Sequence, residues 1–207
     1  MKKIWSILLM GSLALLLLAG CSQTEKPNAD GNHSQDGKLS VYASFYPMYD
    51  FASKIGGDKA KVVTMVPAGT EPHDWEPTAA DITGLEKADV FVYNGAGMEH
   101  WAPDVLESLQ NKELIAVETS KGLTLRDGHH EHEDENEDEE KDEHEQEGKE
   151  YDPHVWLNPM NAKKQMENIK DAFVKADPDN KDYYKANYNK YAADFEALDK
   201  EFKDTLS

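Results

Sequence analysis

The chain has 207 residues and a formal net charge of −19, with 41 acidic residues against 22 basic ones. Nucleic-acid binding requires clustered lysine and arginine side chains that replace the counterions of the phosphates. Because the chain has a single arginine, Arg126, and no basic stripe, nucleic acid is excluded as a partner. The acidity is concentrated, since residues 127–150 hold fourteen acidic residues and two lysines.

Residues 1–20 have the pattern of an export signal, with two lysines, an apolar run and then small residues. The apolar run is shorter than the roughly 20 residues that a membrane-spanning helix needs. The only cysteine, Cys21, follows Leu-Ala-Gly, and this segment resembles the bacterial lipobox. We therefore predict a signal peptide over 1–20, a lipid on Cys21 and a flexible tether over 21–37. These features predict a lipid-anchored protein on the extracytoplasmic face of the cell membrane.

Short β-rich runs and helical patterns alternate along the next part of the chain. The predicted strands are residues 39–44, 61–66, 89–93 and 114–117, and the predicted helices are residues 46–55, 78–87 and 101–110. This alternation predicts an α/β fold, with a mostly parallel sheet flanked by helices. In such sheets, the loops that leave the carboxyl ends of the strands carry the binding groups.

Two helices are predicted at the C-terminal end, residues 160–175 and a long helix within 178–207, separated by Asp177-Pro178-Asp179. The long helix has one apolar stripe at spacings of three and four, which is made of Tyr184, Tyr188, Tyr191, Phe195, Leu198 and Phe202. At 1.5 Å per residue, about 28 helical residues extend roughly 40 Å. A stripe of this length needs a partner, which could be the sheet, a second copy or a further domain.

The segments Pro72-His73-Asp74-Trp75 and Pro153-His154-Val155-Trp156 share a pattern, and each is followed by another proline. Proline biases the preceding residue toward extended backbone and so keeps both segments out of helices. Imidazole is the commonest metal-binding side chain, and two stiff loops could bring His73 and His154 to one ion. Alternatively, each histidine is hydrogen-bonded beside its tryptophan without binding metal. The repetition favours a metal site, and we expect Trp75 and Trp156 to shield it from water.

The acidic segment 127–150 lacks large apolar residues, and its like charges repel one another, so we predict a disordered loop. It contains four of the eight histidines, His129, His130, His132 and His144. These histidines are candidates for auxiliary, weak metal binding. They are equally consistent with a solubilising tract that holds incidental histidines. A primary site is not expected here, because ordering the segment around an ion costs conformational entropy.

Three passages, residues 67–78, 94–101 and 152–159, resemble the motifs of zinc and manganese substrate-binding lipoproteins of ABC importers. The zinc-uptake receptors are the nearer likeness, because the manganese members commonly lack a long acidic, histidine-rich loop. The resemblance implies two α/β lobes joined by a long rigid helix, with the metal between them. It assigns His73 and His154 as metal ligands of the first lobe.

In that family a further histidine and an acidic residue come from a second lobe, for which this sequence has no counterpart. The resemblance therefore implies a first lobe over 38–176, a linking helix over 178–207 and a missing second lobe, as in an N-terminal fragment or a truncated product. We expect the chain to be a monomer.

The function implied is capture of Zn²⁺ as cargo and its delivery to an ABC permease, without enzymatic activity. Imidazole ligands favour Zn²⁺ over Mn²⁺ by the Irving–Williams order. A zinc hydrolase is the first alternative, with Glu71, Asp74 or Glu99 as general base, although no His-Glu-x-x-His pattern is present. An acidic surface protein that buffers metal or serves in cell adhesion is the second alternative.

Two further features are given structural roles. We predict that His100 lies on the surface or caps a helix. We predict that Asn94-Gly95-Ala96-Gly97 forms a tight strand-to-helix turn, because it lacks the lysine of a P-loop.

Overall fold

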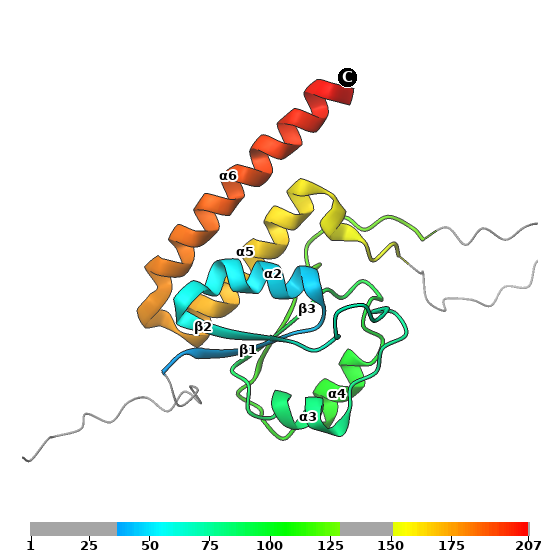
Figure 1. Cartoon of the computed structure of the whole chain (residues 1–207), viewed down its shortest axis with the longest axis vertical. Helices are drawn as coiled ribbons and strands as arrows, with labels where there is room; N and C mark the ends of the chain where they lie inside the picture. The colour runs from blue at the N-terminus through cyan, green and yellow to red at the C-terminus, as the bar shows by residue number, and fades with distance from the viewer. Residues whose placement is uncertain (1–36, 129–150, 207) are drawn as a thin grey trace, which may run out of the picture. The chain divides into compact units, whose positions relative to one another are not determined.

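The computed structural model describes residues 37–128 and 151–206. Its centre is a four-stranded sheet in which every pair of neighbouring strands is parallel (Figure 1). In spatial order the strands are β2 (Ala60–Thr64), β1 (Leu39–Ala43), β3 (Val90–Tyr93) and β4 (Ile115–Glu118). Each of the four strands lies at one of the runs predicted from the sequence, and the parallel sheet is confirmed.

Five α-helices connect or follow the strands in the described part of the chain. They are α2 (Tyr46–Gly56), α3 (Ala79–Leu85), α4 (Ala102–Ser108), α5 (Pro159–Ala176) and α6 (Lys181–Leu206). At the start of α3 the predicted capping box is present: Thr78 Oγ1 accepts from Asp81 N–H, and the Asp81 carboxylate accepts from Thr78 N–H. The predicted helices therefore form, with ends that shift by a few residues.

The helices cover both faces of the sheet (Figure 1). On one face, α2, α5 and α6 enclose a core with Leu39 and Val41 of β1. On the other face, α3 and α4 enclose a smaller core around Phe91 and Trp101. A parallel sheet buried on both faces explains why its two central strands, β1 and β3, are rich in apolar residues.

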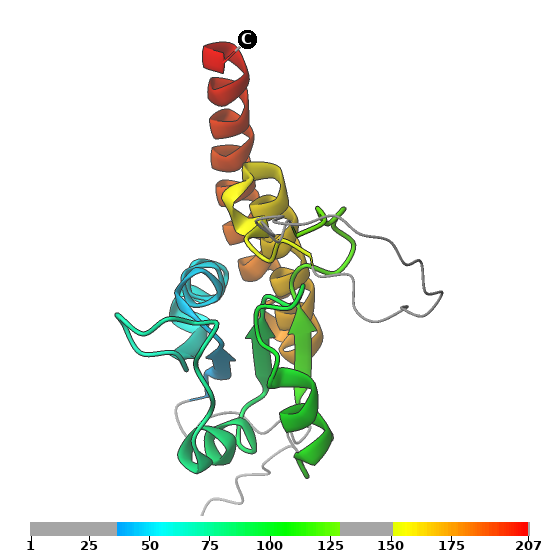
Figure 2. The ribbon, with the colours of Figure 1, turned by 90° about the vertical axis from the view of Figure 1, so that its right-hand side faces the viewer.

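Helix α6 packs beside α5, as both views show (Figure 2). The ring of Tyr184 is fully buried and lies 5.5 Å from that of Phe173. The Asn187 amide donates to the Ile55 carbonyl at the end of α2. Toward the helix end, Phe202 is 48% exposed and Leu206 is 82% exposed. The predicted stripe is therefore buried at its first residue, partly buried along its middle and exposed at Leu198 and Phe202.

Between residues 37 and 128, and between 151 and 206, no helix combines the length and apolar character needed to cross a bilayer. The predicted signal peptide, Cys21, the tether before Gly37 and residues 129–150 of the acidic segment lie outside the described residues. The two sides of that segment meet in an antiparallel bridge between Asp127 and Tyr151. Asp127 is thus part of the ordered chain, although the sequence placed it in the disordered loop.

The strand order creates a position where binding groups are expected. From β1 the chain crosses to β2 on one side, while β3, the other neighbour of β1, leads on to β4. Adjacent crossovers that run in opposite directions leave a crevice at the carboxyl ends of the two central strands. Ser44 follows β1 and Asn94 follows β3, so both lie at this crevice.

Candidate metal centre

His73 lies in the loop between β2 and α3. A turn closed by the Thr70 N–H and the Pro67 carbonyl, 3.1 Å apart, shapes the first part of this loop. The backbone N–H of His73 also lies 3.4 Å from the Glu71 carboxylate. The histidine is half-buried, whereas residues 67–71 are exposed. The loop therefore presents one imidazole at the carboxyl edge of the sheet.

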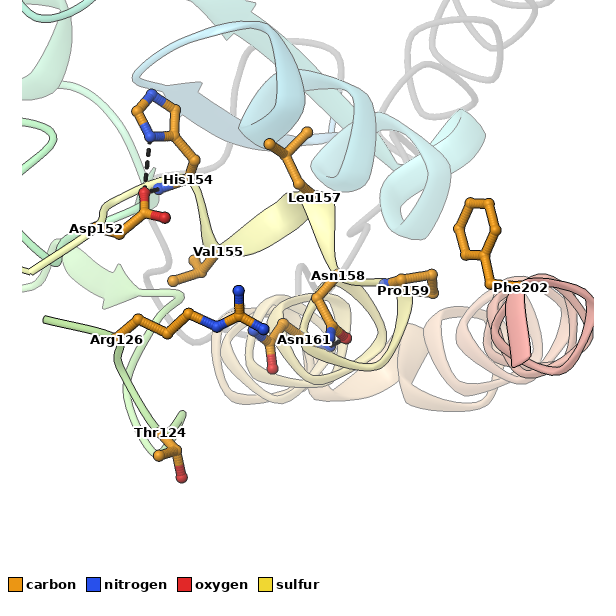
Figure 3. Close-up of a pocket in the computed structure, with 10 residues that line it drawn as sticks. All are labelled: Thr124, Arg126, Asp152, His154, Val155, Leu157, Asn158, Pro159, Asn161 and Phe202. Atoms are coloured by element: carbon orange, nitrogen blue, oxygen red, sulfur yellow. Dashed lines mark hydrogen bonds and ion pairs between the residues drawn. The ribbon is translucent and has the colours of Figure 1, made fainter. Parts of the chain in front are cut away.

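His154 lies in the segment between the Asp127–Tyr151 bridge and α5 (Figure 3). A single 3₁₀ turn over Val155–Leu157 follows it, and the buried Val155 anchors that turn. Asn158 then caps α5, because its Oδ1 accepts the N–H groups of Met160 and Asn161. The segment is fixed on both sides, so the exposed His154 ring extends from a defined backbone.

The structure brings the two predicted histidines together. Their Nε2 atoms are 3.5 Å apart, and their ring centroids are 5.4 Å apart. Two imidazoles bound tetrahedrally to one Zn²⁺ at about 2.0–2.1 Å would have their nitrogens ~3.4 Å apart. A direct N–H···N hydrogen bond would be shorter, at about 2.7–3.2 Å. The separation thus fits two ligands of one ion better than a hydrogen-bonded pair.

Asp152 orients the His154 ring. Its Oδ1 atom lies 2.8 Å from His154 Nδ1 and 3.0 Å from the backbone nitrogen of His154 (Figure 3). Because a carboxylate only accepts, the ring proton is on Nδ1, which leaves the lone pair of Nε2 facing His73. Hydrogen bonds from the backbone and then the ring of His154 lower the pKa of Asp152. A carboxylate behind a histidine is a common arrangement at metal sites.

Two cavities border His154. The larger, about 430 Å³, is lined by both histidines, Phe45, Trp156 and the exposed loop before His73. The smaller, about 320 Å³, is shown in Figure 3 and lies beside Arg126 and Asp152. The histidine pair therefore faces an open cavity rather than the closed interior of the lobe.

The two tryptophans of the repeated segments have different neighbours. The Trp156 ring lies 5.4 Å from the His154 ring, beside the pair. The Trp75 ring instead lies 5.4 Å from Trp101, in the core beneath α3 and α4. Trp75 packs against both cores of the lobe, and the shielding of the histidines by the two tryptophans stays a prediction.

His100 is exposed, as predicted, but it does not cap α4, whose N-cap residue is Trp101. Its Nε2 atom lies 3.2 Å from the backbone carbonyl of His73. The carboxylate of Glu99, which is only 7% exposed, accepts hydrogen bonds from the Ser44 hydroxyl and the N–H groups of Asn94 and Gly95. Glu99 thus joins the ends of β1 and β3, which argues against its use as a general base.

Within residues 37–128 and 151–206, no set of three or more histidine, cysteine, aspartate or glutamate side chains is placed to hold an ion. This part of the chain offers the pair His73 and His154. The auxiliary histidines His129, His130, His132 and His144 lie outside the described residues, as does Cys21. The orienting role of Asp152 was not predicted from the sequence. Its position two residues before His154 is nevertheless a usable signal, because an aspartate side chain commonly accepts a hydrogen bond from the backbone N–H two residues later.

The family model for zinc-uptake complex component A, periplasmic (ZnuA), matches residues 41–207. The chain belongs to this ZnuA family. The resemblance found in the sequence is confirmed, and so is the α/β fold that it implied.

The ZnuA relatives include a high-affinity zinc uptake system protein of Bacillus subtilis, 44% identical over 206 residues. That match covers 99% of this chain and 62% of the relative. The crystal structure of a metal-dependent lipoprotein, YcdH, from Bacillus subtilis is 41% identical with a TM-score of 0.69, covering 81% of this chain and 56% of that one. The crystal structure of Zn(II)-bound AdcA from Streptococcus pneumoniae is 35% identical with a TM-score of 0.67. That match covers 80% of this chain and 32% of the AdcA chain. The chain thus spans less than two thirds of each.

Proposed function

We propose that this chain is the part of a zinc receptor that supplies His73 and His154 as two ligands for captured Zn²⁺. The observation that carries the proposal is the 3.5 Å separation of the two Nε2 atoms. Asp152 supports it by leaving the lone pair of His154 Nε2 free on the side of His73. Membership of the zinc-uptake family and the names of its relatives support zinc as the cargo.

Zinc is favoured over manganese by the ligand chemistry. Imidazole binds Zn²⁺ well and Mn²⁺ poorly, whereas manganese prefers carboxylate, carbonyl and water oxygens. The ligands proposed among the described residues are both imidazoles. Structural zinc takes four ligands, so two remain to come from water or from groups outside the described residues.

The proposed role is capture and delivery, without catalysis. The receptor would pass Zn²⁺ to the permease of an ABC importer, as the family description of a zinc-uptake component supports. Lipid on Cys21 would hold it at the extracytoplasmic face of the membrane, as the lipoprotein name of the zinc-binding AdcA relative supports.

Zinc titration of the purified protein against a competing chelator tests the site. His73→Ala and His154→Ala should each weaken the tightest site by at least about 100-fold, beyond the roughly 10–100-fold typical of outer-shell substitutions. His33→Ala, a histidine substitution in the predicted tether, is the matched control and should leave the affinity unchanged. Wild-type affinity in either site variant would remove the basis of the proposal.

A second set of variants separates the receptor from a metal buffer. Replacing His129, His130, His132 and His144 together by alanine should leave one tight zinc site and remove only weak binding. If the fourfold variant loses the tight zinc site while His73→Ala retains it, the result would favour a metal-buffering protein over a receptor. Turnover of ester or peptide substrates by the zinc-loaded protein, lost in His154→Ala, would instead favour a hydrolase.

A further inference from the structure

The turn Asn94–His100 lies between the two histidine loops and contacts both of them. It leaves the carboxyl end of β3 and leads into α4. Its backbone has positive φ at Gly95, Ala96 and Gly97 in succession, with values of 76°, 54° and 86°. Ala96 is the single described residue other than glycine with such a φ, and this conformation is costly for a residue with a Cβ atom. The surrounding contacts must therefore hold the turn in place.

The first of these contacts reaches the His154 segment. The Asn94 amide nitrogen donates to the backbone carbonyl of Pro153 at 2.9 Å, one residue before His154, and to its neighbour Gly95 at 2.9 Å. The orientation of this amide is fixed, because its Oδ1 accepts from Gln165 Nε2 at 2.8 Å. Asn94 is fully buried, so the donor side of the bond to Pro153 is shielded from water.

The second contact reaches the His73 loop. His100 Nε2 lies 3.2 Å from the backbone carbonyl of His73. A carbonyl only accepts, so this ring nitrogen carries a proton and donates it. Within the same turn, the buried Glu99 carboxylate binds Asn94 and Gly95 N–H, which fixes the spacing between Asn94 and His100.

We propose that the turn Asn94–His100 is a positioning element that sets the separation of the two imidazoles, with Asn94 acting on His154 and His100 acting on His73. The proposal rests on the proposed function for its purpose, since positioned imidazoles matter only if they share a ligand. Its physical basis is preorganisation: two ligands already held at the spacing of the bound state lose less entropy when the ion arrives.

The chain offers a matched control for Asn94. Asn168 on α5 also donates its amide to two backbone carbonyls, those of Thr119 at 2.9 Å and Lys121 at 3.0 Å. Neither carbonyl belongs to a histidine loop. Asn168→Ala therefore removes the same kind and number of amide donations as Asn94→Ala, without touching the proposed positioning contacts. His100→Ala is a second test variant that should fold, because its side chain is exposed.

The first readout uses metal-free protein, so it does not depend on zinc binding. With ring centroids 5.4 Å apart, the His73 and His154 rings should show mutual nuclear Overhauser effects in NMR spectra. These cross-peaks should disappear or fall at least about twofold in Asn94→Ala and His100→Ala, and remain in Asn168→Ala. The second readout is zinc affinity, which should fall about 10-fold in Asn94→Ala, as for other outer-shell substitutions, and remain unchanged in Asn168→Ala.

Unchanged cross-peaks in both Asn94→Ala and His100→Ala would overturn the proposal, as would their absence from the wild-type protein. An equal loss in Asn168→Ala would also overturn it, because the effect would then reflect general destabilisation. If the cross-peaks behave as expected but no variant or wild-type protein binds zinc tightly, the positioning role stands and the proposed function fails. If Asn94→Ala does not fold, His100→Ala alone decides between these outcomes.

Discussion

His154 donates its Nδ1–H to Asp152 Oδ1 across 2.8 Å, and its own backbone N–H reaches the same oxygen at 3.0 Å. Because both residues are in one short loop, this carboxylate moves together with the imidazole that it orients. Both side chains are about half exposed, at 46% for His154 and 48% for Asp152. The ring is therefore fixed mainly by Asp152 and by its contacts with His73 and Trp156.

Asp152→Ala should weaken zinc binding by about 10-fold, because the free ring would lose its tautomer and its orientation. Asp152→Asn keeps an oxygen that can accept from Nδ1, so its loss should be smaller. Both affinities can be measured by competition with a chelator. Equal affinities for Asp152→Ala and the wild type would show that the carboxylate does not orient the ligand.

Glu99 should make stability depend on pH. Burial raises the pKa of Glu99 above its ordinary value of 4.5, and hydrogen bonds from Ser44, Asn94 and Gly95 oppose this rise without cancelling it. Between the ordinary and the raised pKa, the folded protein binds more protons than the unfolded chain. The free energy of unfolding should therefore fall as the pH rises through this window.

The comparison with Glu99→Gln isolates this effect, since glutamine does not titrate. The free energy of unfolding of the wild type minus that of Glu99→Gln should decrease as the pH rises above 4.5, as measured by urea unfolding. The exposed Glu107→Gln is the charge-matched control. A difference that grows with pH would mean that hydrogen bonding, rather than burial, dominates at Glu99.

Tyr184→Phe tests how α6 is held. The Tyr184 hydroxyl donates to the buried Asp177 carboxylate at 2.7 Å, and burial, followed by this bond, raises the pKa of Tyr184. Removing the hydroxyl leaves Asp177 with one fewer donor in a buried site, which should cost about 1–3 kcal/mol of unfolding free energy. Tyr183→Phe is the control, because its hydroxyl accepts an exposed bond from Asp58 N–H. Equal losses in chemical unfolding would contradict a special role for the buried bond.

Gly56 shows where packing should outweigh helix propensity. A Cβ atom at Gly56 would lie 2.5 Å from Ala60 Cβ and 3.2 Å from the Phe173 ring. Alanine gains up to about 1 kcal/mol in a helix, but overpacking a buried contact costs about 1–3 kcal/mol. Gly56→Ala should therefore lower the thermal unfolding midpoint, and a higher midpoint would show that the chain relaxes around the methyl group.

Sequence periodicity alone predicted the elements that form the sheet. The runs at β1 and β3 are rich in apolar residues because both faces of a parallel sheet are covered. Helix α3 begins directly after Thr78 because Thr78 and Asp81 form its capping box. The prolines beside His73 and His154 likewise excluded helix at both positions. Strand patterns, helix caps and proline effects depend on residues that are close in the chain, so they can be predicted without the tertiary structure.

The tertiary structure decided which of these residues meet. The 3.5 Å contact joins residues 81 positions apart, and the bond from Asn94 to the Pro153 carbonyl spans 59 positions. Packing likewise directs the Trp75 ring toward Trp101, 26 positions later in the chain. Ligand type and loop stiffness follow from the local sequence, whereas distances between loops follow from the strand order and from buried hydrogen bonds between distant segments.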